Sequence, residues 1–460
     1  MPLTARKRKI VFLGNCQSQS LATVYRERLA FYNDDLVTYI DIQNVRTSPA
    51  EGAKALAEAD TVVLQLFDFP TKLSAADLRP ECKIMKFPSV VAGFYWPFAS
   101  QHHIHTPKGE IDPPYPAQLG DRILNGYIAK GLDPAAALKL YLEMDVASVA
   151  GLDRLFELYM DRQEQRDKAA GIDVAPVLLE HFRDEQIFLT PDHPNLRVFG
   201  VLARNIYQML GSSETAVERA LDALPATPFP HSALPIHPSV IKHFGLKFAD
   251  EKTRYPYLEE GSFTFEEYVL RYMKYEWNEE LKKGILGDDP LPERLETLSR
   301  GLRKSPDSVV GWRVLAELLL RQEKPLDAHS AACRSCMLGP ANADSWVTYY
   351  RTLVALKDLD GAKRIAADCV AKFPQSSTIH YLAAESILHH GGNMAECVKR
   401  AESAVRLQSG NPHAHYLLGL SLTRSGDLTG AEESMRAAIE IAPANTEFKR
   451  ALDRILSQKN

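Results

Sequence analysis

A spacing of 34 residues runs through the last third of the chain and restricts its fold more than any other feature. Pro306, Pro340 and Pro374 are 34 residues apart, and Pro443 falls one residue off the continued series. Small residues recur at nearly the same interval, at Ala328, Ala362, Cys397 and Ala431. A fixed period of this length is typical of stacked repeats, in which each unit buries its apolar face against the next.

A ring side chain recurs near the start of each unit, at Trp312, Trp346, His380 and His415. With its early ring, central small residue and final proline, the unit resembles the tetratricopeptide repeat, a pair of helices. We expect about four units over residues 307–443 and a capping helix over 445–456. The resemblance implies a surface for a protein partner. Packing on the rest of the chain, or self-association, is the alternative.

The 460 residues are too many for one ordinary domain. We expect a first domain over residues 1–278, a linker over 279–305 that contains several glycines and prolines, and an all-α repeat domain over 306–460. In the first domain, short apolar segments at 9–13, 37–42, 61–66 and 83–87 alternate with helical patterns at 18–31 and 49–59. This alternation predicts an α/β fold with a parallel sheet, followed by a helical insertion over about 120–224.

The segment Gly14-Asn15-Cys16-Gln17-Ser18 follows the first predicted strand and opens a helix. It has neither the glycines of a dinucleotide-binding loop nor the Gly-Lys-Ser/Thr of a Walker loop. The positive end of the helix dipole should lower the pKa of the Cys16 thiol. Amides of this loop are candidates for holding an oxyanion or a phosphate, and Gln65 ends the third strand at the same edge. A buried cysteine without a function is the alternative.

His193 lies among turn-forming residues just before a predicted helix at 196–210. A histidine there can act as general base to a thiol or a hydroxyl. A cap or a turn residue is the alternative. His102, His103 and His105 have no paired carboxylate or cysteine at ligand spacing, so we expect a surface loop and no metal site.

Several segments of the first domain share one order with a known family. They are the opening strand with Gly14-Asn15-Cys16-Gln17, the Gln65 strand, Phe87-Pro88, the Gly131 to Ala135 turn, Phe188 to Pro194, Pro235 to Val240, and Phe263 to Tyr272. Over residues 8–276 the chain resembles the WcbI-like polysaccharide-biosynthesis family.

This resemblance implies an α/β domain with an SGNH- or Rossmann-like parallel sheet and a site for coenzyme A or acetyl-coenzyme A. It implies acyl transfer, acetyl transfer in particular, to a saccharide hydroxyl in surface or capsular polysaccharide biosynthesis. Carried onto this chain, the catalytic residues are Cys16 and His193. The cofactor-binding residues are Gly14, Asn15, Gln17, Ser18 and Gln65.

Two routes stay open: His193 takes a proton from Cys16 in a ping-pong mechanism, or directly from the acceptor hydroxyl. Two other functions also stay open. One is an SGNH-like carbohydrate esterase, although Thr190 stands where those enzymes carry an aspartate, three residues before the histidine. The other is a non-catalytic adaptor built on the same domain.

The composition argues against a nucleic-acid-binding protein, a membrane-spanning protein and a disulfide-rich protein. The net charge of −5 argues against a nucleic-acid partner, since phosphate neutralisation needs a basic surface. No apolar run approaches the roughly 18 residues of a transmembrane helix. Six cysteines in so long a chain do not make a disulfide framework. We expect a cytoplasmic protein, with peripheral attachment to the inner membrane through partners as an open alternative.

Overall fold

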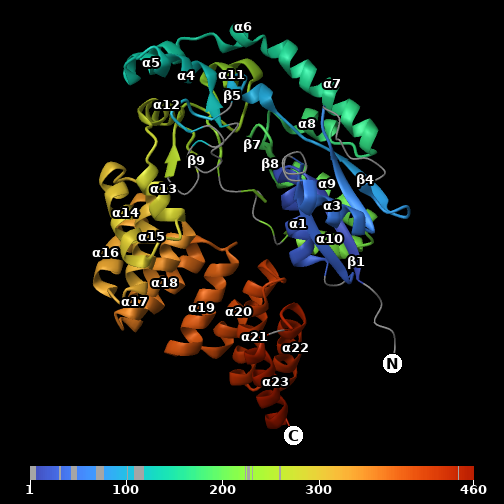
Figure 1. Ribbon diagram of the computed structural model, residues 1–460, viewed down its shortest axis with the longest axis vertical. Helices are drawn as coiled ribbons and strands as arrows, with labels where there is room; N and C mark the ends of the chain where they lie inside the picture. The colour runs from blue at the N-terminus through green and yellow to red at the C-terminus, as the bar shows by residue number, and fades with distance from the viewer. Residues whose placement is uncertain are drawn as a thin grey trace. The chain divides into compact units, whose positions relative to one another are not determined.

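The chain divides into two compact units, whose main boundary lies between Trp277 and Asn278 (Figure 1). The structure is a computed structural model. It describes residues 7–30, 33–42, 49–68, 77–100, 102–107, 115, 119–222, 224, 228–229, 232–257, 261–443 and 445–459. Among these residues, no helix combines the length and the apolar character that a membrane span requires.

A four-stranded parallel sheet forms the centre of the first unit, as predicted. Its strands are β1 (Arg8–Gly14), β2 (Asp35–Asp41), β3 (Thr61–Leu66) and β4 (Lys83–Pro88), in the order β2-β1-β3-β4. Strand β1 pairs with β2 on one side and with β3 on the other. The chain therefore changes sides of β1 between β2 and β3. This creates a switch point beside the carboxyl end of β1, where open α/β sheets bind ligands.

Alternate residues of β1 enter two separate cores. Ile10 and Phe12 face the larger core, together with α1 (Cys16–Arg28) and α9 (Leu196–Met209). Val11 and Leu13 face a smaller core with α3 (Pro49–Glu58). Because both faces are covered, β1 reads as a continuous apolar run rather than an alternating one.

Residues 119–222 are mainly helical, as expected. The helices between the sheet and the boundary are α4 (Arg122–Ala129), α5 (Pro134–Leu142), α6 (Val146–Ala150), α7 (Leu152–Ala170), α8 (Ala175–His181), α9, α10 (Glu214–Asp222), α11 (Pro238–Phe244) and α12 (Phe265–Lys274). Short strands accompany them: β5 (Ala99–Ser100) with β6 (Gly120–Asp121), β7 (Phe188–Thr190) with β8 (His193–Pro194), and β9 (Tyr255–Tyr257) with β10 (Gly261–Phe263). The β7–β8 hairpin places His193 in a strand, so it is neither the helix cap nor the turn residue given as the alternative.

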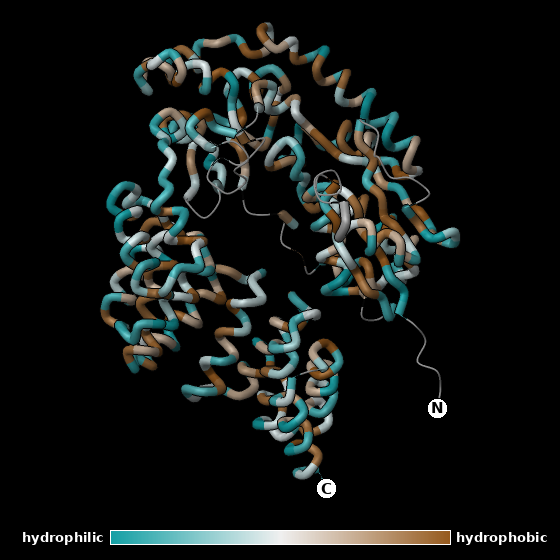
Figure 2. The backbone as a smooth tube through the Cα atoms, in the orientation of Figure 1, coloured by the Kyte–Doolittle hydropathy of each residue, from teal (hydrophilic) through white to brown (hydrophobic). Residues whose placement is uncertain are grey.

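The second unit contains the four predicted helix pairs and the capping helix. The pairs are α15 (Val309–Arg321) with α16 (Pro325–Leu338), α17 (Ala343–Ala355) with α18 (Leu359–Lys372), α19 (Ser377–His390) with α20 (Met394–Leu407), and α21 (Pro412–Ser425) with α22 (Leu428–Ile441); α23 (Thr446–Lys459) follows. Figure 2 shows hydrophobic and hydrophilic residues alternating along these helices, as amphipathic helices require.

In the helix pairs, the recurrent ring forms a hydrogen bond to a backbone carbonyl six residues before it. Trp346 Nε1 donates to the carbonyl of Pro340 at 3.0 Å, six residues before it, and Trp312 bonds the Pro306 carbonyl in the same way at 2.9 Å. In the third pair, His380 Nε2 bonds the Pro374 carbonyl at 3.0 Å. A ring N–H closes the turn before the helix, so histidine can replace tryptophan there.

The linker predicted over residues 279–305 is wrong. This segment forms helices α13 (Glu279–Leu286) and α14 (Leu291–Lys304), whose leucines share a core with Val314 and Leu318 of α15. Gly301 permits the close crossing, since a Cβ there would lie 2.4 Å from the Leu281 nitrogen. Pro290 serves as the N-cap of α14. The glycines and prolines that indicated a loop therefore serve helix packing and helix initiation.

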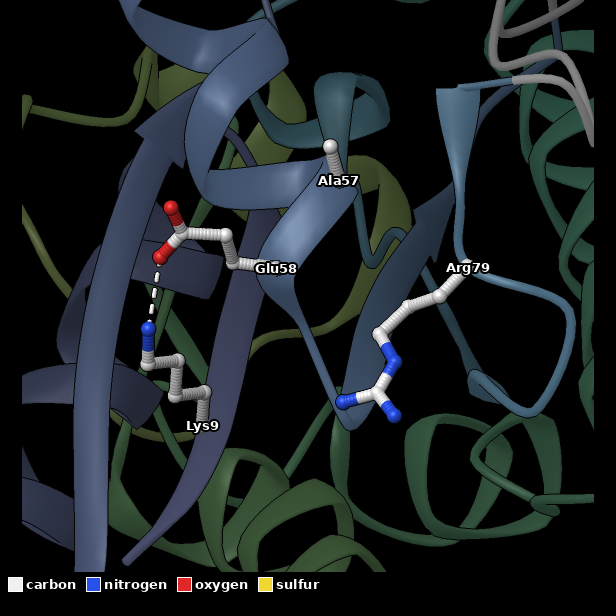
Figure 3. A pocket seen from close by; sticks show the side chains of 4 residues that line it. All are labelled: Lys9, Ala57, Glu58 and Arg79. Carbon is white, nitrogen blue, oxygen red and sulfur yellow. Dashed lines mark hydrogen bonds and ion pairs between the residues drawn. The ribbon is translucent and has the colours of Figure 1, made fainter.

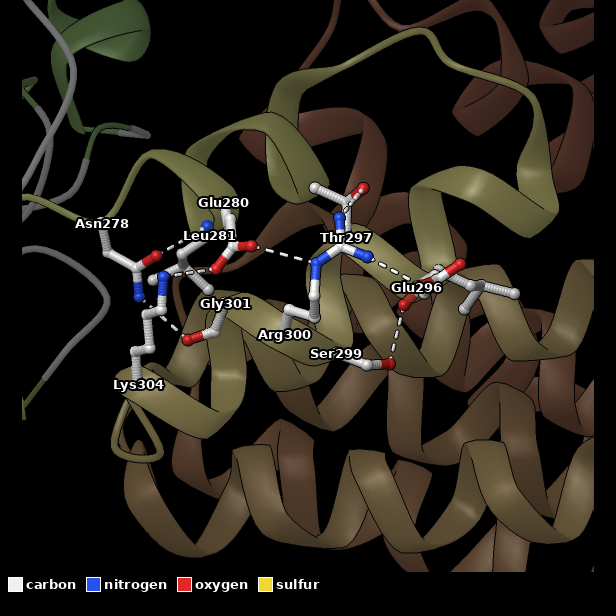
Figure 4. A network of polar contacts seen from close by, with 10 residues as sticks. Asn278, Glu280, Leu281, Glu296, Thr297, Ser299, Arg300, Gly301 and Lys304 are labelled. Atoms are coloured by element: carbon white, nitrogen blue, oxygen red, sulfur yellow. Dashed lines mark hydrogen bonds and ion pairs between the residues drawn. The ribbon is translucent and has the colours of Figure 1, made fainter.

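Polar contacts also join these two helices (Figure 4). Asn278 Nδ2 donates to the Gly301 carbonyl at 2.9 Å, and Arg300 Nε donates to Glu280 at 3.0 Å. Lys304 pairs with the same Glu280 carboxylate at 2.6 Å. Helices α13 and α14 thus belong to the helical unit.

Candidate functional site

The loop between β1 and α1 lies at the carboxyl edge of the sheet, next to the switch point. The Asn15 side-chain oxygen accepts a hydrogen bond from the Gln17 N–H at 3.0 Å and caps α1. The backbone N–H of Asn15 donates to Gln65 Oε1 at 2.9 Å. A Cβ at Gly14 would lie 2.3 Å from that same oxygen, so only glycine leaves room for the Gln65 side chain.

The Gln17 amide is a buried hub that connects three chain segments. Its Nε2 donates to the carbonyls of Val90 at 2.6 Å and Asp192 at 2.8 Å. Its Oε1 accepts from Gln65 Nε2 at 3.1 Å and from the Val90 N–H at 3.1 Å. Two donors and two acceptor positions are all that an amide offers. In this arrangement the Gln17 and Gln65 side chains hold the loop together. The cofactor contact of Gln17 stays a prediction.

Cys16 begins α1, as predicted, but its ionisation differs from the prediction. Burial and the nearby Asp192 carboxylate raise the pKa of the thiol well above its ordinary value. The backbone N–H groups of Gln17 and Cys16 act in the opposite direction and do not compensate. The expectation of a lowered thiol pKa is thus wrong in sign, because desolvation outweighs the helix N-terminus.

Asp192 was not among the predicted site residues. It lies with Pro191 in the two-residue turn of the β7–β8 hairpin, since Thr190 and His193 pair directly. Burial raises the pKa of its carboxyl to about 6. Among the described residues, no cation pairs with this carboxylate. A Pro-Asp step between two short extended segments is a hairpin signal, and it was the available clue.

His193 lies beside this turn but does not form the predicted pair with Cys16. Its ring stacks on Phe229 at 4.7 Å between centroids and 10° between planes. Its Nδ1 atom is buried and has no hydrogen-bond partner. Burial lowers the pKa of the imidazole to about 4, so the ring is neutral at physiological pH.

Three buried polar atoms of these segments lack a hydrogen-bond partner in the described part of the chain: Ser18 Oγ of α1, Thr190 Oγ1 of β7 and His193 Nδ1 of β8. Unpaired buried polar atoms are uncommon and call for a ligand or a bound water. They lie on the two segments that also carry the Cys16 thiol and the Asp192 carboxyl.

Of these three histidines, His103 lies in the core, His102 is half-buried and His105 is exposed, so the expected surface loop is buried at one position. His103 is fully buried and its ring packs on Tyr115 and Tyr272. His103 Nε2 bonds the Tyr272 carbonyl at 2.9 Å, and His105 Nδ1 bonds the Tyr275 carbonyl at 3.0 Å. These histidines join the chain near α12 to the rest of the unit.

An open hollow occurs at the opposite, amino-terminal edge of the sheet (Figure 3). It is lined by Lys9, Ala57, Glu58 and Arg79. Lys9 pairs with Glu58 at 2.5 Å, and Arg79 pairs with Asp60 at 2.5 Å. Because these charges neutralise each other, the hollow offers little to a charged ligand.

The family model described as "Polysaccharide biosynthesis enzyme WcbI" matches residues 9–215. This segment of the chain is similar to that family. A tetratricopeptide-repeat model matches residues 391–446. The chain thus combines a WcbI-like polysaccharide-biosynthesis domain with a tetratricopeptide-repeat array. All seven predicted site residues, and Asp192, lie within the WcbI-family match.

Solved structures resemble both parts. One is WcbI itself, "a novel polysaccharide biosynthesis enzyme", as native protein without a disulfide bond between coenzyme A and a cysteine; it is 14% identical, with 72% of this chain and 99% of that chain covered and a TM-score of 0.43. A thermophilic tetratricopeptide-repeat protein of Thermus thermophilus is 18% identical, with 39% and 97% covered and a TM-score of 0.34. YrrB, a repeat protein "with an unusual peptide-binding site", is 16% identical, with 35% and 82% covered and a TM-score of 0.30. No curated protein matches the chain.

Proposed function

We propose that the WcbI-family domain transfers an acyl group, such as acetyl, from coenzyme A to a saccharide hydroxyl in the biosynthesis of a surface or capsular polysaccharide. The observation that carries the proposal is the hydrogen bond from Gln17 Nε2 to the Asp192 carbonyl at 2.8 Å, which joins the loop that carries Cys16 to the turn that carries Asp192 at the switch point of the sheet. The family match supports the saccharide substrate. Coenzyme A, and a cytoplasmic location where acyl-coenzyme A is made, follow from the family resemblance.

The side chains of the site fit the thioester end of such a donor. The half-buried Cys16 sulfur offers a polarisable, weakly polar surface. The unpaired hydroxyls of Ser18 and Thr190 can donate hydrogen bonds to a carbonyl or an amide. When bound, the coenzyme supplies an activated acyl group. The side chains named here would hold its thiol end, and Asn15 and Gln65 would keep the loop in place.

The ionisation of Cys16 favours direct transfer over a ping-pong route. A covalent route needs a thiolate, and the thiolate is the form that burial and Asp192 disfavour. The same observation disfavours an esterase, since its nucleophile must be activated by a neighbouring base and His193 is not paired with Cys16. We propose that Cys16 lines the thiol end of the site as a neutral group.

We propose that the repeat array is the surface that binds a protein partner. The array has its own hydrophobic clusters and contains none of the site residues. We propose that it recruits the domain to other enzymes of glycan synthesis or to the acceptor.

Calorimetric titration with coenzyme A and acetyl-coenzyme A tests the cofactor assignment. We expect micromolar binding by the wild type, and an affinity changed at least threefold in Cys16→Ala. Cys82→Ala is the matched control, because Cys82 lies just before β4 at the other edge of the sheet, and it should bind like the wild type. If the well-folded wild type binds neither molecule, the proposed function is wrong.

A further inference from the structure

We propose that Asp192 is the catalytic base of this site and accepts the proton of the acceptor hydroxyl. The inference rests on the proposed function and assigns within it the residue that moves the proton. It replaces His193 in the role that the sequence predicted. Three observations carry it: the way the turn is fixed, the environment of the carboxyl group, and the state of the other candidate bases.

The backbone of the hairpin turn is fixed from two sides. Gln17 Nε2 donates to the Asp192 carbonyl at 2.8 Å, and the Ala92 N–H donates to the Pro191 carbonyl at 2.8 Å. Both bonds accept at backbone carbonyls, and the Asp192 carboxyl itself accepts from its own backbone N–H, which lowers its pKa less than burial raises it. The turn therefore presents this side chain from a fixed position at the carboxyl edge of the sheet. Such preorganisation is what a catalytic group needs.

The surroundings of the carboxyl suit a base. Cys16 of α1 and Tyr159 of α7 are the ionisable groups on which the Asp192 carboxylate acts, and both are neutral at physiological pH. On its own hairpin the neighbour is His193, which is also neutral. No described cation stabilises the carboxylate. Burial thus makes it more basic than an exposed aspartate, with a pKa of about 6, so it is ionised and ready to accept a proton at neutral pH.

The alternative bases are less suitable. The Cys16 thiol stays protonated. Asp41 ends β2, and its carboxyl accepts a hydrogen bond from the Tyr39 hydroxyl at 3.4 Å. The imidazole of His193 stacks on Phe229, and its pKa of about 4 makes it a weaker base than Asp192. His193 is a positioning residue, which holds the hairpin against the core.

The proposed step balances without a further reactant. Asp192 takes the proton from the acceptor hydroxyl as the acceptor oxygen forms a bond to the acyl carbon. The bond between that carbon and the donor sulfur breaks, and the electron pair leaves with the sulfur. The proton then passes from Asp192 to the sulfur, which departs as a thiol. The carboxylate is regenerated, and no oxidant or metal is required.

A test without any acyl donor measures the alkylation rate of each cysteine by iodoacetamide between pH 7 and 9.5, resolved by peptide mass spectrometry. Removal of the Asp192 carboxylate should lower the pKa of Cys16, so Asp192→Asn should react at Cys16 at least threefold faster at pH 8.5. Asp41→Asn is the matched control and should give a smaller increase, and Cys82 is the internal reference. If Cys16 is alkylated at the same rate in the wild type and in Asp192→Asn, the Asp192 carboxylate does not lie beside the Cys16 thiol, and the proposal is overturned.

The second test measures thiol release from acetyl-coenzyme A with methyl glucoside or water as acceptor, alongside calorimetric binding. We expect wild-type kcat/KM to fall below about pH 6. Asp192→Asn should lose at least 100-fold in kcat, while its affinity for coenzyme A stays within threefold. The kcat of His193→Gln should fall less than tenfold, and its kcat/KM should still decrease below about pH 6. If Asp192→Asn keeps wild-type kcat and its acid limb, Asp192 is not the base, although the proposed function stands. If the wild type binds no coenzyme A, the proposed function fails, and the base assignment within it fails too.

Discussion

Gly14 has no side chain because the Gln65 amide occupies the space where one would lie. We expect Gly14→Ala to destabilise the first unit by about 2–3 kcal/mol, since Gln65 and Ser18 must both move. Gly126→Ala is the matched control: Gly126 lies inside α4 with nothing within 4 Å of a new Cβ, and alanine should stabilise the helix by up to about 1 kcal/mol. Urea unfolding of both variants checks this, and equal changes would contradict the steric explanation.

At the residue scale, the sequence predicted the position of the loop between β1 and α1 but not the ionisation of its thiol. A strand followed by Gly14 and Asn15 predicts where Cys16 lies, because local backbone rules determine the start of α1. The ionisation of that thiol depends on burial and on Asp192, which arrives from a distant part of the chain. The helix dipole depends on neighbouring residues alone and reflects neither effect. The lowered pKa of His193 has the same kind of cause, since burial and the contact with Phe229 come from distant residues.

At the scale of elements, α13 and α14 extend the array by a pair that the period does not reveal. One period before Trp312 and Ala328 stand Asn278 and Arg294, so the repeat signature is missing. Asn278 instead caps α13 through its side-chain oxygen. The four β-strands, by contrast, were predictable because each is a short apolar run. The later helix pairs were predictable because each keeps the residues that recur every 34 positions.

The packing of α14 on α15 can be measured by truncating one leucine. Leu298 is fully buried between α13 and α15, and Leu298→Ala should destabilise the helical unit by about 3 kcal/mol. Leu286 at the end of α13 is 58% exposed, so Leu286→Ala should change its stability by less than about 0.5 kcal/mol. Thermal unfolding followed by circular dichroism distinguishes them. A linker would predict no effect from either change.

At the scale of the whole molecule, every residue of the candidate site belongs to the first unit. A fragment of residues 1–277 should therefore bind coenzyme A with the affinity of the full chain in calorimetry. A fragment of residues 1–215 is the control. It lacks the Leu234 carbonyl that accepts from Trp96 Nε1 at 3.1 Å, and it lacks α12, so it should not fold. Loss of binding by a folded 1–277 fragment would show that the array contributes to the site.

The Gln17 hub also determines when the site can exist during synthesis. Gln17 and the Asp192 carbonyl are 175 residues apart in the chain. At about 5–20 residues per second, a ribosome needs roughly 9–35 s to make that stretch. During this interval the strands of the sheet are already available to pair, while the thiol has neither its carboxylate neighbour nor the hairpin above it. A nascent chain therefore carries Cys16 in a more exposed and more reactive state than the finished protein does.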